Sequence, residues 1–87
     1  MPTVWVPALL RPLTGGRATV PAAGATVAEV IDDLETRHPG LKARLVAGDR
    51  LQPGLAVVVD GETSALKLRQ PLRENSDVHF VVTISGG

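Results

Sequence analysis

The sequence ends in Val78-His79-Phe80-Val81-Val82-Thr83-Ile84-Ser85-Gly86-Gly87. Branched and aromatic side chains fit a pleated surface, so residues 78–84 predict a strand. Successive side chains of a strand point to opposite faces, which separates two sets: Val78, Phe80, Val82 and Ile84 on one face, and His79, Val81 and Thr83 on the other. We expect the Phe80 face to pack on a helix and the Val81 face to stay open.

The last three residues, Ser85-Gly86-Gly87, predict a flexible tail after a single domain that spans residues 1–84. Glycine has no Cβ atom, so this tail can thread a narrow channel and bring the α-carboxylate of Gly87 to chemistry on another protein. Val81 is an apolar residue beside the tail, and we expect a partner to bind there. The competing interpretation is a disordered terminus without a function.

The composition excludes several classes of function. The chain has 87 residues, with nine Lys and Arg residues against nine Asp and Glu residues. The arginines are spread along the sequence, which argues against a nucleic-acid partner. The absence of cysteine excludes disulfides, thiol catalysis and cysteine zinc sites. The apolar runs are strand-sized and the N-terminus does not resemble a signal peptide, so we expect a cytoplasmic protein that does not enter a membrane.

One amphipathic helix is predicted near the middle of the chain. Thr26-Val27-Ala28-Glu29 has the pattern of a capping box, in which Thr26 accepts from the N–H of Glu29 and Glu29 reaches back. The apolar residues that follow recur at helical spacing, at Val27, Val30, Ile31 and Leu34. We expect the acidic residues between them to be solvated. His38-Pro39-Gly40 ends this helix, and residues 41–46 predict a short second one.

The other apolar runs predict strands. Residues 3–6 and 18–20 form a hairpin around an irregular loop, and residues 55–59 form a covered strand that ends at Asp60-Gly61. Residues 47–50 are expected to be a loop, and residues 62–68 to hold a short edge strand. The connection after the hairpin is long enough for the last strand to pair in parallel with the first. The predicted fold is α+β, a ubiquitin-like β-grasp with a mixed four- to five-stranded sheet packed on one main helix.

These features together resemble the ubiquitin-like sulfur carriers, the family of the molybdopterin-synthase small subunit and the thiamine-biosynthesis sulfur carrier (MoaD/ThiS). The matching stretches are residues 7–11 with the Gly15-Gly16 turn, the helix start at 26–30, residues 57–62, and residues 75–78 leading to 84–87. Residues 10–16 and 30–35 more narrowly resemble the actinobacterial carriers that supply sulfur for cysteine synthesis. In this pattern Thr83-Ile84-Ser85 stands where many relatives have prolines.

The resemblance implies a mechanism. An ATP-dependent adenylyltransferase of the MoeB/ThiF type would bind the open sheet face at His79, Val81 and Thr83. The Gly87 carboxylate would attack ATP and form an acyl-adenylate, and a sulfur donor would displace AMP to leave a thiocarboxylate. ATP and Mg²⁺ would belong to the activating partner, with no cofactor or metal on this chain. The sulfur acceptor would be a biosynthetic enzyme, for cysteine a PLP-dependent synthase.

Three other functions remain open on the sequence. A ubiquitin-like modifier would use the same tail to attach Gly87 to target lysines. A molybdopterin-synthase small subunit would insert the tail permanently into a larger enzyme. An interaction module would carry the two glycines incidentally. An independent enzyme is the weakest interpretation, because His38, His79 and the helix acids offer no base paired with a nucleophile.

Overall fold

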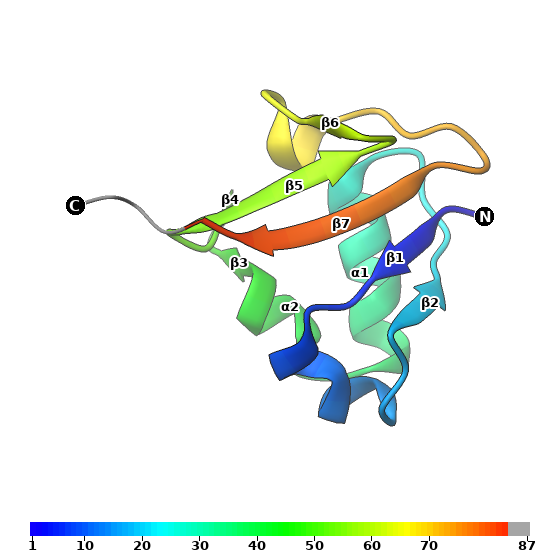
Figure 1. The fold of residues 1–87 in the computed structure, drawn as a ribbon, viewed down its shortest axis with the longest axis vertical. Helices are drawn as coiled ribbons and strands as arrows, with labels where there is room; N and C mark the ends of the chain where they lie inside the picture. The colour runs from blue at the N-terminus through cyan, green and yellow to red at the C-terminus, as the bar shows by residue number, and fades with distance from the viewer. Residues whose placement is uncertain (84–87) are drawn as a thin grey trace.

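The computed structural model describes residues 1–83, and they form one five-stranded mixed sheet, a main helix and several short elements (Figure 1). The sheet has the order β2-β1-β7-β5-β6, and a separate hairpin pairs β3 with β4. The bounds of the strands are β1 Thr3–Trp5, β2 Thr19–Pro21, β3 Val46–Ala47, β4 Arg50–Leu51, β5 Leu55–Val59, β6 Glu62–Thr63 and β7 Asp77–Val82. The helices are α1 Val27–Arg37, α2 Leu41–Leu45 and the 3₁₀ helices η1 Ala8–Thr14 and η2 Lys67–Arg69.

The strand β7 is the centre of the sheet. It pairs in parallel with β1, with Val4 opposite Val78, and antiparallel with β5, with Val57 opposite Phe80. The parallel pairing of the first and last strands confirms the prediction, and it places the two ends of the domain's chain in adjacent strands. As a result, β1 lies beside the first half of β7, residues 77–79, and β5 lies beside residues 78–82.

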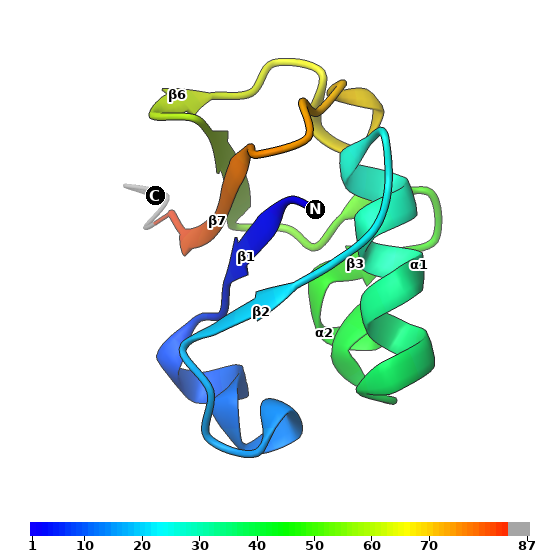
Figure 2. The same ribbon diagram turned by 90° about the vertical axis from the view of Figure 1, so that its right-hand side faces the viewer.

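Helix α1 covers one face of the sheet, as the view along the strands shows (Figure 2). The predicted apolar stripe, Val27, Val30, Ile31 and Leu34, is fully buried. It packs with alternate residues of the strands, among them Val4, Val57, Val78 and Phe80. Thr26 accepts from the Glu29 N–H at 3.2 Å as predicted, but the Glu29 carboxylate accepts from the N–H of Ala25. The capping box therefore also holds the connector that leads into the helix.

The predicted packing of Val82 on the helix is wrong, because this side chain is exposed. Val82 is 69% exposed, whereas Val78 and Phe80, four and two residues earlier on that face, are buried. The hydrophobic core between the sheet and the helices includes Phe80 and not Val82, so the last residues of β7 extend beyond the edge of the core. Ile84, placed on the same face by the sequence, lies outside the described residues.

Two segments that the sequence predicts to be irregular form regular secondary structure. The stretch around Pro12 forms η1, and its Leu10 and Leu13 pack against the core. The segment at residues 47–50 is the β3–β4 hairpin, stabilised by the Gln52 side-chain amide, which donates to the carbonyls of Ala43 and Val46. These elements depend on tertiary contacts and not on a local apolar pattern.

The acidic residues of α1 are also not simply solvated. Asp33 accepts from the N–H of Ala23 at 2.9 Å and pairs with Arg37, and the hydrogen bond from Ala23 is the main cause that lowers the pKa of Asp33. Glu35 accepts from the N–H groups of Gly40 and Lys42, which open the short helix α2. The polar face of α1 therefore holds the segments on both sides of the helix in place.

Candidate functional site: the open face of the sheet

The face of the sheet opposite α1 carries a parallel stack of two rings. The indole of Trp5 in β1 and the imidazole of His79 in β7 have centroids 4.9 Å apart and planes 9° apart. The register of the parallel pair sets this contact, because Trp5 lies directly opposite His79. Trp5 is 41% exposed, and its Nε1 lies 3.5 Å from Asp77 Oδ1 at the edge of the stack. This ring pair is a flat, partly exposed surface with the Asp77 carboxylate at its edge.

Val81 continues the same face toward the end of β7. It lies opposite Ala56 in β5, whose small side chain leaves Val81 39% exposed. Val58, opposite His79, is half-buried on this face. We call the surface formed by Trp5, Ala56, Val58, His79 and Val81 the open face. None of these five residues has a carboxylate, ammonium or guanidinium group, and four of them are apolar, which suits a partner that buries the surface on binding.

Thr83 marks the point where the chain leaves the sheet. Its N–H donates to the carbonyl of Gly54 at 2.6 Å, one residue beyond the end of β7. Gly54 has a φ of +80°, in the region that favours glycine, so the turn before β5 presents its carbonyl without strain. The structure therefore brings His79 and Val81 together on the open face and leaves Thr83 exposed at its end.

The start of β7 is held by the turn that follows β5. Asp60 and Gly61 both have positive φ, 51° and 87°, as a two-residue hairpin between β5 and β6 requires. The Asp60 carboxylate accepts from the N–H of Asp77 at 2.9 Å and from the hydroxyl of Ser76 at 2.9 Å. These bonds, the one from Asp77 first, lower the pKa of Asp60, and Arg73 adds to the effect. The charged turn thus fixes the strand that carries the open face.

Sequence reasoning missed Trp5, Ala56 and Val58 as parts of this surface. The alternation in residues 3–6 places Trp5 opposite to Val4 and Val6, which are both buried. Combined with the predicted parallel pairing of the first and last strands, this alternation was a sufficient signal for Trp5. The predicted reactive residue Gly87, and Ser85 and Gly86 of the predicted tail, lie outside the described residues.

The described part of the chain offers few other sites. Within residues 1–83 no three His, Asp or Glu side chains are grouped so that they could hold a metal ion. No helix in the same range is long and apolar enough to cross a membrane.

Comparisons with known proteins agree with this picture. The sulfur carrier protein CysO of Mycobacterium tuberculosis is 46% identical over 52 residues, which are 60% of this chain. A chain in the crystal structure of the Amycolatopsis orientalis BexX/CysO complex is 39% identical with a TM-score of 0.89, and the match covers 100% of both chains. SAMP1 of Haloferax volcanii is 28% identical with a TM-score of 0.72, covering 99% of this chain and 98% of that one.

These similarities confirm the predicted β-grasp fold over the length of the chain. The region matched in the curated CysO protein is about half of that protein, 54% of its length. A family model described as the ThiS family matches residues 4–87, which is nearly the whole sequence. The chain belongs to the ThiS family.

Proposed function

We propose that this protein is a sulfur carrier whose C-terminal Gly87 is adenylated and converted to a thiocarboxylate. The main support is the geometry of β7. The strand β7 presents His79 and Val81 on the open face, and Gly87 follows Val81 by only six residues in the sequence. Six residues span at most about 20 Å, so an enzyme docked on Val81 has Gly87 within the reach of one active site. The relatives named sulfur carrier proteins support the same function.

The chemistry requires no reactive side chain from the carrier. A Gly87 carboxylate oxygen attacks the α-phosphorus of ATP, pyrophosphate leaves, and an acyl-adenylate forms. A sulfur nucleophile then attacks the carbonyl carbon and AMP leaves. If the nucleophile is hydrosulfide, the product is the thiocarboxylate. If it is a persulfide, the product is an acyl disulfide, and a thiol then reduces its S–S bond to leave the thiocarboxylate and a new disulfide. The absence of cysteine from the sequence agrees with a carrier that holds sulfur on its main-chain terminus.

The partners follow from these steps. An adenylyltransferase of the MoeB/ThiF type would supply ATP, Mg²⁺ and the phosphate-binding groups. A sulfur-accepting enzyme would then take the sulfur, and we propose cysteine synthesis by a PLP-dependent synthase as the pathway. The chain in the BexX/CysO complex, similar over its whole length, was crystallised with a protein partner. This supports a function through contacts with protein partners.

A modifier is the second candidate, because SAMP1 of Haloferax volcanii is named a small archaeal modifier protein and is similar over nearly its whole length. In that function Gly87 would be activated in the same way and then joined to a lysine amine. Adenylation alone therefore does not separate the two functions. The bond that Gly87 finally makes separates them.

The direct test is a reconstitution. The full-length protein is incubated with the activating enzyme of its own organism, ATP, Mg²⁺ and sulfide, and its intact mass is measured. We expect a gain equal to the exchange of one oxygen for sulfur, mapped to the C-terminal peptide. A variant that lacks Gly87 is the matched control and should gain nothing. An unchanged mass in the full-length protein, with an activating enzyme shown to be competent on another carrier, would contradict the proposal.

A substitution in the tail tests the expected narrow channel. Gly86→Ala adds one methyl group and disfavours positive φ, which costs about 1 kcal/mol or more if the bound tail needs that conformation. We expect slower adenylation with an unchanged melting temperature. Unchanged adenylation would contradict the channel, although not the function.

A further inference from the structure

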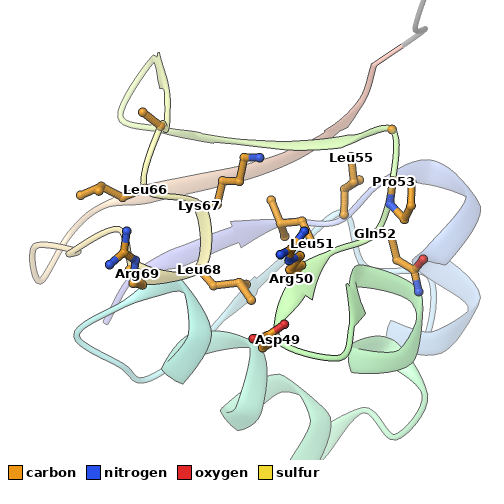
Figure 3. A pocket seen from close by; sticks show the side chains of 12 residues that line it. Asp49, Arg50, Leu51, Gln52, Pro53, Leu55, Leu66, Lys67, Leu68 and Arg69 are labelled. Carbon is orange, nitrogen blue, oxygen red and sulfur yellow. The ribbon is translucent and has the colours of Figure 1, made fainter.

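A second surface lies beside the point where the chain leaves the sheet. A groove of about 550 Å³ separates the β4 region from η2 (Figure 3). Gly54 and Leu55 line one end of it, and Gly54 accepts the hydrogen bond from Thr83. This hydrogen bond places the groove beside Thr83. Gly87 follows Thr83 by four residues, which span at most about 14 Å of extended chain. The groove is lined by other residues than those of the open face.

Cationic side chains from both walls reach this groove. Arg50 comes from β4, and Lys67 and Arg69 come from η2 on the opposite side (Figure 3). All three are exposed, and none of the three salt bridges found in residues 1–83 involves them, since the basic partners there are Arg37, Lys42 and Arg73. Asp49 is the single carboxylate in the lining. The groove thus has an excess of positive charge that the described chain does not neutralise.

The floor of the groove is apolar. Leu51 is almost fully buried, and Leu55 and Leu68 are half-buried and pack against the core. A neighbouring hollow of about 420 Å³ shares Asp49, Leu68 and Arg69 with the groove and continues it toward α1. A ligand that fits this surface carries negative charge together with an apolar side chain.

The backbone at Lys67 is held in an unusual conformation. Its φ is +54°, a region in which a residue other than glycine is strained. The N–H of Lys67 donates to Ser64 Oγ, and Ser64 in turn donates to the Gln70 side chain at 2.6 Å, so the turn is fixed by its own hydrogen bonds. A lysine at a position where glycine is less strained suggests that the side chain has a use there.

We propose that this cationic groove binds an acidic, amphipathic segment of the enzyme that adenylates Gly87, with its carboxylates at Arg50, Lys67 and Arg69 and an apolar side chain against Leu51 and Leu68. The inference rests on the proposed function, because it names a contact of that activating enzyme. The enzyme then holds the carrier on both sides of the chain's exit from β7, at the open face and at the groove. Nucleic acid fits less well, because the lining contains no aromatic side chain on which a base stacks.

Two double variants that have the same net charge as each other test the groove. Arg50→Gln with Arg69→Gln removes two groove cations, and Arg17→Gln with Arg44→Gln removes two exposed cations elsewhere. The activity measured is ATP–pyrophosphate exchange catalysed by the activating enzyme with each carrier, at low and high salt. We expect the groove pair to raise the KM for the carrier about tenfold at low salt and less at high salt, because salt screens the contacts. The control pair should change the KM less than about twofold.

The outcomes distinguish the inference from the function on which it rests. No exchange with the unaltered carrier would contradict the proposed function. Exchange with equal KM values for the two pairs would overturn the groove contact and leave the function intact.

A binding measurement without ATP gives an independent readout. The isotope-labelled full chain is titrated with a blocked peptide, Glu-Leu-Glu-Glu-Leu-Glu, and with its Gln-for-Glu counterpart. Saturable shifts of the Arg50, Leu51 and Arg69 amides by the acidic peptide alone, with a Kd near 1 mM, support the proposal. The absence of such shifts, or tighter binding of a six-nucleotide RNA at the same amides, would overturn it.

Discussion

The rings of Trp5 and His79 lie parallel on the open face, with 4.9 Å between their centroids, although 73 residues separate them in sequence. The parallel pairing of β1 with β7 creates this contact. Stacked aromatic pairs contribute about 0.5–1.5 kcal/mol to the free energy of unfolding beyond the effect of burying their surface. Because Trp5 is exposed, we expect this pair to lie at the low end of that range. A double-mutant cycle of Trp5→Ala and His79→Ala in urea unfolding should give a coupling free energy of about 0.5 kcal/mol. Strictly additive effects would contradict a stabilising stack.

Val81 and Val82 provide a matched test of the open face. They are adjacent and exposed, but they point to opposite faces of β7. Val81→Asp places a charge on the open face, and we expect it to raise the KM for the carrier in activation at least about tenfold, as a central interface residue does. Val82→Asp has the same chemistry and should change the KM much less. Equal effects of the two substitutions would mean that the partner does not select the open face.

The Asp60 carboxylate should make stability depend on acidity. Its pKa is lowered in the folded protein, chiefly by the hydrogen bond from the Asp77 N–H. The folded state therefore binds this proton more weakly than the unfolded chain does. The resulting stabilisation is fully present above the unfolded pKa, about 3.9, and is lost as the pH falls through the lower folded value. Asp33, whose pKa is also lowered, adds to the same loss.

Asp60→Asn isolates this effect. Asparagine tolerates the φ of +51° at this position, so the turn can form while the charge is removed. We expect a melting temperature several degrees lower at pH 7 and a smaller drop in stability between pH 5 and pH 3 than in the unaltered protein. Asp49→Asn, at an exposed position, is the control and should leave the melting temperature unchanged. If Asp60→Asn lost as much stability between pH 5 and pH 3 as the unaltered protein does, the Asp60 carboxylate would not be a cause of that loss.

The buried stripe of α1 should dominate stability. Leu34 is completely buried between the helix and the sheet, and Leu34→Ala removes apolar contacts and leaves a cavity. The expected loss is about 2–5 kcal/mol in the free energy of unfolding, measured by urea denaturation. Leu9, which is 89% exposed, is the matched control, and Leu9→Ala should change stability by less than about 0.5 kcal/mol.

The sequence predicted the parts of the fold that local patterns determine. The helical spacing of Val27, Val30, Ile31 and Leu34 identified α1, and strand alternation separated Phe80 from Val81. The β3–β4 hairpin was not predictable in this way, because its support comes from the Gln52 side chain and not from an apolar repeat. The exposure of Val82 depends on where the core ends, which periodicity within one strand does not contain.

The candidate site was predictable in part for the same reason. The alternation within one strand predicts that His79, Val81 and Thr83 share a face, whereas Trp5 joins them only through pairing between distant segments. The cationic groove was not predictable from the sequence, because only the packing of β4 against η2 brings Arg50 and Arg69 to the same groove. Arg73, equally basic in the sequence, is instead paired with Asp60.

The most direct test of the proposed function is the intact mass of the protein isolated from its native cells under non-oxidising conditions. A carrier should contain a fraction in which one oxygen is replaced by sulfur, and fragmentation should place that sulfur on Gly87. Gly87 joined to a lysine amine, with no sulfur-containing form in cells grown under sulfur demand, would contradict the carrier function and make the modifier the correct interpretation.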